Sequence, residues 1–207
     1  MIVVKVGGAV TAVAELGEFD DAVVVHGGGP QITAAMAAAG LSATFVRGRR
    51  VTDEAALAVV RETLLEVNRE LCELIGPRAL GLAGDEIGLQ ATRVPELGHV
   101  GTPIPTRPQA VLDALAAGRV PVIAPLAVGP LNVNADEAAS ALAVGLGAER
   151  IIFLSDVPGV ILPRISANDA DELLGELEGG IVPKLQAAVH AARLGVRAEI
   201  GITEVTA

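Results

Sequence analysis

The chain contains very few lysines and aromatic residues. Among its 207 residues are two lysines, three phenylalanines, no tyrosine and no tryptophan. Proteins that bind nucleic acid need a basic surface, and those that bind single strands commonly stack bases on aromatic rings. With a formal net charge of −10 and so few rings, this chain offers neither feature. We therefore expect no nucleic-acid partner.

Other absences exclude further classes of protein. A single cysteine, Cys72, cannot form an intramolecular disulfide. No apolar run approaches the ~20 residues that span a bilayer, and the first residues lack the layout of a signal peptide. His26, His99 and His190 are far apart and show no metal-ligand spacing. We expect a cytoplasmic protein with no membrane partner and no metal held by its side chains.

Short apolar runs alternate with helical patterns along the whole chain. Strands are predicted at Ile2–Val6, Ala22–Val25, Ala79–Leu82, Val120–Ile123, Ile151–Leu154 and Ala198–Ile202. Helices are predicted at Gln31–Ala39, Glu54–Ile75, Gln109–Ala117, Ala135–Leu146, Ala170–Leu177 and Val182–Leu194. Such alternation predicts an α/β fold whose mainly parallel sheet is covered by helices on both faces. The segment Val94–Pro108, rich in Pro and Gly, is predicted to be a hairpin or an extended loop.

The helix predicted at Glu54–Ile75 carries a narrow apolar stripe. Its members recur at alternating steps of three and four: Leu57, Val60, Leu64, Val67, Leu71 and Leu74. A stripe of this kind faces either the chain's own core or a partner helix. Both interpretations remain open from the sequence.

Two glycine-rich loops follow the first two predicted strands. They read Lys5-Val6-Gly7-Gly8 and His26-Gly27-Gly28-Gly29-Pro30-Gln31. Glycines after a strand let backbone N–H groups approach an anion, although tight strand-to-helix turns use glycine as well. Two such loops, one with a lysine, favour an anion-binding site. A histidine before a glycine loop is more often a structural hydrogen-bonder than a base.

A third polar segment, Asn132–Glu137, begins a predicted helix. Asn134 is a suitable N-cap, with Glu137 three residues later as in a capping box. Asp136 then lies in the first turn, where the helix dipole favours an anion. A well-capped helix start would explain these residues, but two asparagines and an aspartate also suit a ligand site.

Several common catalytic motifs are missing. The sequence has no G-x-x-x-x-G-K-[ST] and no G-x-G-x-x-G, so neither a P-loop nor a Rossmann dinucleotide site is indicated. None of its serines lies in G-x-S-x-G, which excludes the nucleophile elbow of α/β-hydrolases.

Together the motifs resemble the acetylglutamate kinases of the amino acid kinase family. The resemblance runs from Met1 to about Ala198. It rests on VVKVGGA (3–9), VVHGGGPQI (24–32), FVRGRRVTD (45–53), PELGHVG (95–101), PLNVNADEAASALA (130–143), LSDVPGV (154–160) and GGIVPKLQAAVHAARLGV (179–196).

The resemblance implies a three-layer αβα sandwich formed as one domain. Residues 1 to about 125 would bind the acyl amino acid and form a homodimer, and residues 126–207 would bind ATP. It also implies the substrate N-acetyl-L-glutamate, with Mg²⁺ held by the nucleotide phosphates. A sister kinase acting on carrier-linked aminoadipate or glutamate, and a lapsed ligand-binding member, are the alternatives.

Residue roles follow from the matched motifs. Lys5 and Lys184 would flank the transferring phosphoryl group, and Asp136 would orient both lysines. The phosphate and the reacting carboxylate would be held by Gly8 and the amides of Gly27, Gly28 and Gly29. Arg50, Asn132 and Asn134 would bind the rest of the substrate. Gly7, Ser155, Asp156 and Val157 would lie at the nucleotide together with Lys5, Gly8 and Lys184.

This assignment fits the chemistry of carboxylate phosphorylation. The attacking carboxylate is already ionised at neutral pH, so the reaction needs no general base. Catalysis then consists of positioning and of neutralising the developing charge. Two lysines and backbone amides can supply that neutralisation. An arginine such as Arg50 suits bidentate recognition of a carboxylate better than a lysine does.

The sequence departs from the family pattern in two places. It stops at Ala207, where relatives usually continue to a closing strand, and the segment after Gly159 is compressed, so ATP affinity is the property expected to change. Arg47 and Arg49 stand where the family has Asn and Leu. They are either solvated surface cations or extra positive charges that suit a more anionic substrate. Because Ile2–Val6 already forms a strand, no N-terminal helix is expected, and we predict a dimer insensitive to arginine.

Overall fold

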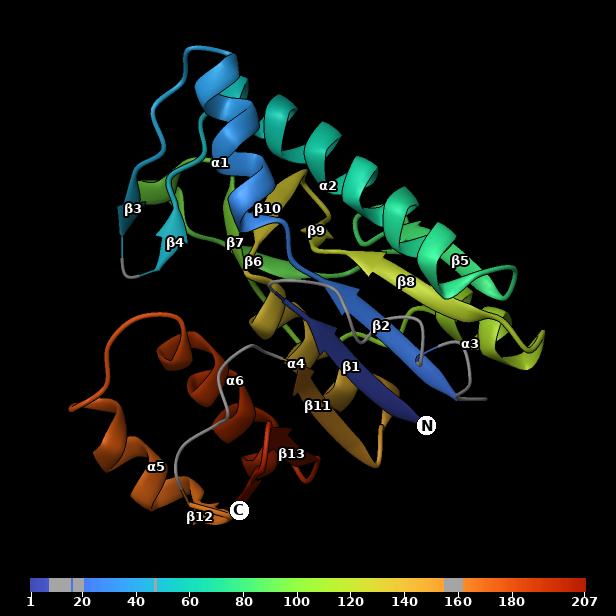
Figure 1. Cartoon of the computed structure of the whole chain (residues 1–207), viewed down its shortest axis with the longest axis vertical. Coiled ribbons are helices and arrows are strands. Elements are labelled where there is room, and N and C mark those ends of the chain that lie inside the picture. Colours follow the sequence, from blue (N-terminus) through green and yellow to red (C-terminus); the bar gives the residue numbers. More distant parts are fainter. Residues whose placement is uncertain (8–15, 17–20, 47, 155–161) are drawn as a thin grey trace.

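The computed structural model describes residues 1–7, 16, 21–46, 48–154 and 162–207. An eight-stranded sheet forms the centre of this described part, in the order β12-β14-β13-β11-β1-β2-β8-β5 (Figure 1). The strands are β1 (Ile2–Val6), β2 (Ala22–His26), β5 (Ala79–Ala83), β8 (Val120–Ala124), β11 (Arg150–Leu154), β12 (Arg164–Ser166), β13 (Arg197–Ile200) and β14 (Thr203–Thr206). The six strands from β13 to β5 run parallel to one another. Strand β14 is antiparallel to β13, and β12 is parallel to β14.

The predicted helices are present, and the bounds of four of them differ from the prediction. They are α1 (Gly29–Ala38), α2 (Glu54–Ile75), α3 (Gln109–Ala116), α4 (Ala135–Leu146), α5 (Ala167–Leu174) and α6 (Ile181–Arg193). The bounds of α2 and α4 match the prediction. Helix α5 begins three residues earlier than predicted. The side chain of Ser166 accepts a hydrogen bond from the Asp169 N–H and so caps the helix at this earlier position.

The predicted strands are also present, except that the last one ends earlier than expected. Strand β13 stops at Ile200, and Gly201 adopts a φ of +55°, which turns the chain back into β14. The prediction of one strand over Ala198–Ile202 was therefore wrong at its end. Ile202 lies in the turn and is 69% exposed.

Alternate residues of the central strands pack against different helical layers. Val3 of β1 belongs to a core cluster with residues of α4 and α6, whereas Val4 and Val6 pack with the inward face of α2. Figure 1 shows α2 running along the β8 and β5 end of the sheet, and α5 and α6 lying near the end that contains β12 and β13. This confirms the predicted α/β fold with helices on both faces of a mainly parallel sheet.

Two smaller sheets lie beside the main one. The first contains β6 (Ala91–Arg93), β7 (Val100–Pro103), β10 (Leu131–Val133) and β9 (Leu126–Ala127), in the order β6-β7-β10-β9. Its antiparallel β6 and β7 enclose the 3₁₀ turn η2 (Pro95–Leu97), so the hairpin predicted within Val94–Pro108 is present but starts earlier. The second is a hairpin of β3 (Phe45–Val46) and β4 (Arg49–Arg50), which was not predicted.

The apolar stripe of α2 faces the chain's own core. Leu64 is 1% exposed and packs with Ile32 and Met36 of α1. Leu74, by contrast, is 57% exposed, and Ile75 is buried in its place. The core-facing interpretation of the stripe is confirmed, and its assignment as the surface for pairing with a second copy was wrong.

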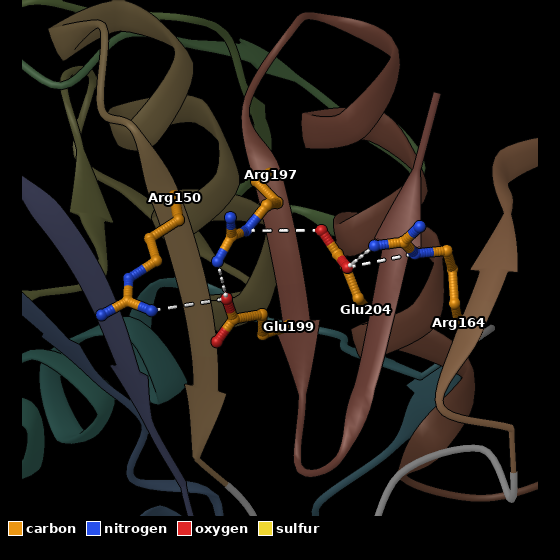
Figure 2. Close-up of polar contacts among 5 residues, drawn as sticks. All are labelled: Arg150, Arg164, Arg197, Glu199 and Glu204. Atoms are coloured by element: carbon orange, nitrogen blue, oxygen red, sulfur yellow. Dashed lines mark hydrogen bonds and ion pairs between the residues drawn. The ribbon is translucent and has the colours of Figure 1, made fainter.

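One face of the strands at the β12 end of the sheet carries charged side chains. Figure 2 shows them as a ladder in which arginines and glutamates alternate, and they come from β11, β13, β14 and β12. Glu199 pairs with Arg150 at 3.5 Å and with Arg197 at 3.1 Å, and Glu204 pairs with Arg197 at 3.4 Å and with Arg164 at 2.8 Å. The ladder places opposite charges beside one another on neighbouring strands, an arrangement that stabilises the pairing of strands.

None of the helices in the described ranges is both long and apolar enough to cross a membrane.

Candidate active site

Two lysines and one aspartate form a buried cluster at the carboxyl end of β1. Lys5 Nζ lies 2.9 Å from Asp136 Oδ1, and Lys184 Nζ lies 3.4 Å from the same oxygen. The side chains of Lys5 and Asp136 are 6% and 7% exposed. The structure therefore brings together the three charged residues that the sequence predicted to act together.

Each member of the cluster is placed by its local structure. Lys5 shares the face of β1 with Val3, which packs toward α4 and α6. Asp136 lies in the first turn of α4, where Asn134 Oδ1 accepts hydrogen bonds from the N–H groups of Asp136 and Glu137. Lys184 belongs to the first turns of α6.

The electrostatic balance of the cluster favours an anion. Two ammonium groups face one carboxylate, which leaves a net charge of +1 in a largely buried place. Burial lowers the pKa of Lys5, Asp136 opposes that shift, and the neighbouring Lys184 adds to it. An anionic group between the lysines would neutralise the excess charge, as a transferring phosphoryl group requires.

Gly7 leaves the space that the Lys5 ammonium occupies. A Cβ atom at residue 7 would lie 2.6 Å from Lys5 Nζ and 3.9 Å from Lys184 Nζ. Any larger residue would therefore displace the lysine. Packing restricts Gly28 in a similar way, because its Cβ would lie 3.1 Å from Leu64 of α2.

Two cavities meet at this cluster. The smaller, of about 200 Å³, contains Arg50 and Asn132, and the larger, of about 750 Å³, contains Gly7 and Lys184. Both are lined by the same five residues, namely Lys5, Gly27, Gly28, Gly29 and Asp136. Two ligands in these cavities would therefore have their reacting groups beside the same lysine and glycine loop.

Arg50 is a buried cation of the smaller cavity. It is 7% exposed, and its Nη2 donates to Thr33 Oγ1 at 2.8 Å and to Gly29 O at 3.2 Å. Its guanidinium also lies 4.6 Å from the ring centre of Phe45. Within the described part of the chain no carboxylate pairs with it, and burial lowers its pKa. An anionic ligand group in this cavity would supply the missing charge.

Arg49 has a carboxylate partner. Its Nη2 donates to both oxygens of Glu137 at 2.8 Å, and its Nη1 donates to Thr102 Oγ1 at 2.8 Å. Glu137 thus does not complete the predicted capping box, because its side chain binds Arg49. Of the two interpretations left open for Arg49, the solvated surface cation does not fit this partly buried side chain, and the ion pair with Glu137 leaves no unpaired charge for a further acidic group.

The two asparagines lie at the small cavity with part of their hydrogen bonding already used. Asn132 Nδ2 donates to Thr52 Oγ1 at 3.1 Å, and that hydroxyl donates to the carbonyl of Arg50 at 2.8 Å. Asn134 Oδ1 caps α4. Both residues line the cavity beside Arg50, and their predicted role in binding substrate stays a prediction.

The second glycine loop joins β2 to α1. The Gly27 N–H donates to Val6 O of β1 at 3.0 Å, and Gly28 is the N-cap of α1. The first turn of a helix has N–H groups without intrahelical partners, which suits an anion. Gly8, Ser155, Asp156 and Val157, together with Arg47, lie outside the described residues.

The sequence reasoning missed the supporting residues of the site. Thr33 and Phe45 contact Arg50; Thr33 lies in the predicted helix α1 but nothing marked its side chain, and Phe45 lies in the two-residue strand β3. Asn68 of α2 is 5% exposed and hydrogen-bonds to His26, which is the structural hydrogen-bonder that the sequence predicted. The sequence signal that could have identified Asn68 is a single amide side chain next to Val67, on the inward face of an amphipathic helix. No group of three or more His, Cys, Asp or Glu side chains in the described ranges could hold a metal ion.

Comparisons with known proteins place this site in a family. The family model described as "Amino acid kinase family" matches residues 1–201. A protein of Saccharopolyspora erythraea named acetylglutamate kinase is 42% identical over 200 residues, a match that covers 84% of this chain and 66% of the relative. The chain thus spans about two thirds of the length of that curated relative.

Solved structures share the fold. The crystal structure of smu.665 from Streptococcus mutans has a TM-score of 0.90 at 25% identity, covering 99% of this chain and 98% of that one. Carbamate kinase from Giardia lamblia, solved bound to AMP-PNP, has a TM-score of 0.70 at 14% identity and covers 99% and 97% of the two chains. The motifs, the fold and the family match agree, and the chain belongs to the amino acid kinase family.

Proposed function

We propose that this protein transfers the γ-phosphoryl group of ATP to the side-chain carboxylate of N-acetyl-L-glutamate, giving N-acetylglutamyl 5-phosphate for arginine biosynthesis. One observation carries the proposal: two cavities share Lys5, Asp136 and the glycine loop, and only the smaller one contains Arg50. This arrangement suits a reaction between two anionic ligands. Relatives named acetylglutamate kinase support the choice of substrate.

Arg50 and Asn132 would hold the substrate in the smaller cavity. The α-carboxylate would accept hydrogen bonds from the Arg50 guanidinium, whose charge has no carboxylate partner in the described residues. The side-chain carboxylate would then lie near Lys5. Because Glu137 pairs with Arg49 and Asp136 pairs with Lys5, Arg50 is the cation of this cavity that has no carboxylate partner among the described residues. This balance favours a simple acyl amino acid over a carrier-linked substrate with a further acidic group.

ATP would occupy the larger cavity, with Mg²⁺ held by its phosphates to neutralise part of their charge. One carboxylate oxygen of the substrate forms a bond to the γ-phosphorus, while the bond from that phosphorus to the β-γ bridging oxygen breaks and ADP leaves. No proton is transferred. Lys5 and Lys184 would stabilise the charge on the phosphoryl oxygens, and Asp136 would hold both ammonium groups in place.

Hydroxylamine trapping tests the proposal. The protein would be incubated with MgATP and, in turn, N-acetyl-L-glutamate, L-glutamate and L-aminoadipate, and the acyl hydroxamate measured. We expect product with N-acetyl-L-glutamate and little with the other two. The Lys184→Ala variant serves as the control for a contaminating kinase. Equal or greater product with aminoadipate would support the sister kinase, and no product with any acceptor would contradict the proposal.

Three further parts of the proposal concern organisation. Residues 1 to about 125 would form a substrate-binding half and residues 126–207 a nucleotide-binding half. Asn132 and Asn134 of the second half also line the smaller cavity. A homodimer and a cytoplasmic location are likewise proposed. Light scattering of the purified protein tests the dimer, whose surface is not the buried stripe of α2.

A further inference from the structure

Asn68 is an amide buried among the apolar residues of α2, on the side that packs against the sheet. Its Nδ2 donates to the carbonyl of Val122 at 2.8 Å and lies 3.0 Å from His26 Nε2. His26 ends β2 and is 1% exposed. On the other side of the imidazole ring, His26 Nδ1 lies 2.9 Å from the carbonyl oxygen of Gly27.

These partners fix a single tautomer of the imidazole. The Val122 carbonyl only accepts, so it holds the NH₂ end of the Asn68 carboxamide toward the sheet and toward His26. Nε2 must then be the unprotonated acceptor. The Gly27 carbonyl also only accepts, so Nδ1 must carry the proton. Both contacts require the neutral Nδ1–H form, which agrees with burial lowering the pKa of His26 to about 4.

The hydrogen bond from His26 sets the orientation of the glycine loop. In a trans peptide the C=O and the following N–H point in opposite directions. Fixing the Gly27 carbonyl toward His26 therefore fixes the direction of the Gly28 N–H. Gly28 lines both cavities and is the N-cap of α1, so under the proposed function its N–H would be a donor for the transferring phosphoryl group.

We propose that Asn68 is a positioning residue for phosphoryl transfer: acting through His26, it fixes the peptide that carries the Gly28 N–H. This inference rests on the proposed function. It assigns Asn68 no contact with substrate. A misdirected donor stabilises the transition state less, and shifts of about 1 Å at a reacting centre can reduce turnover by about 10²-fold.

Gly81 provides an independent means of moving Asn68. It lies on the edge strand β5, and a Cβ added there would lie 2.3 Å from Asn68 Oδ1. The residue is exposed and lines neither of the two cavities that meet at Lys5. A methyl group at this sheet edge would therefore displace the Asn68 carboxamide without touching the substrate site.

Kinetics of matched variants test the proposal. Asn68→Leu and Gly81→Ala should each lower kcat by about tenfold or more, while the KM values for both substrates change by less than about threefold. His26→Asn, which keeps a donor near the Nδ1 position, should retain more turnover than His26→Leu. Thr63→Val on α2 and Leu80→Ala on β5 are the controls and should keep the native kcat. Native kcat in both Asn68→Leu and Gly81→Ala would overturn the proposal.

Nuclear magnetic resonance tests the same link without an activity assay. The ¹⁵N signals of the His26 imidazole, assigned with the His26→Asn variant, should show the Nδ1–H tautomer, and Asn68→Leu should shift the Gly28 amide resonance. An Nε2–H tautomer, or an unmoved Gly28 resonance, would overturn the proposal. If the native protein transfers no phosphoryl group, the proposed function fails, and these spectra still decide whether Asn68 positions Gly28.

Discussion

Replacing Arg50 by methionine should separate substrate binding from protein stability. Arg50 is 7% exposed, and its guanidinium donates to Thr33 Oγ1 and Gly29 O, which are neutral groups. Its charge is therefore desolvated without a carboxylate among the described residues. Replacing a buried ion pair by apolar side chains is often neutral or stabilising, and a buried charge without a partner is costlier than a paired one. We expect the unfolding free energy of Arg50→Met without substrate to equal or exceed that of the native protein.

Substrate binding should weaken at the same time. Charge-assisted hydrogen bonds contribute about 1.5–3 kcal/mol, and tenfold in binding corresponds to about 1.4 kcal/mol, so the KM for N-acetyl-L-glutamate should rise about 10- to 150-fold. The KM for ATP should change little, because Arg50 lines only the smaller cavity.

Urea unfolding and steady-state hydroxamate assays measure the two effects. Arg49→Met is the comparison variant, since it breaks an ion pair with Glu137 and should lower stability. An equal rise of both KM values in Arg50→Met, or a loss of several kcal/mol of stability, would refute the assignment of Arg50 to the substrate carboxylate.

Three further predictions follow from the buried residues. Lys5→Ala and Lys184→Ala should each lower kcat by about 10²- to 10³-fold with smaller effects on KM, and near-native turnover in either would contradict its role. His26 should make folding sensitive to acid: its pKa falls from 6.5 to about 4 on burial, so as the pH drops through this interval the unfolded chain binds a proton that the folded one does not. The unfolding free energy should then decrease by on the order of 3 kcal/mol, a loss that urea titrations of His26→Asn should not show. Leu64→Asp should unfold the chain, as measured by circular dichroism, because Leu64 is 1% exposed in the core; a folded protein of reduced oligomeric state would restore the partner interpretation of the stripe.

The sequence predicted the elements whose patterns are local. Helices α2 and α4 begin and end where predicted, because each has a side-chain N-cap, Asp53 or Asn134, and a glycine after its last residue, Gly76 or Gly147. Strands such as β1 and β2 are mainly apolar runs that are followed by a glycine. The short strands were not predicted, because a pattern of two or three residues carries little signal. Strands β3 and β4, for example, form a hairpin only by pairing with each other.

Contacts between distant segments account for most of the rest. The cluster of Lys5, Asp136 and Lys184 was predicted from motifs, but the sequence could not show that Glu137 pairs with Arg49, 88 residues away. The burial of the α2 stripe depended on where the helix packs. The link from Asn68 to His26 joins a helix interior to a strand end, and no local spacing connects them.

The most direct test of phosphoryl transfer is ³¹P nuclear magnetic resonance of the complete reaction with N-acetyl-L-glutamate and MgATP. We predict that ADP appears together with a new acyl phosphate signal, and that hydroxylamine removes this signal. The Lys5→Ala protein should produce neither within the same time. ADP formed with inorganic phosphate alone, independent of the amino acid, would contradict the proposed transfer to the side-chain carboxylate.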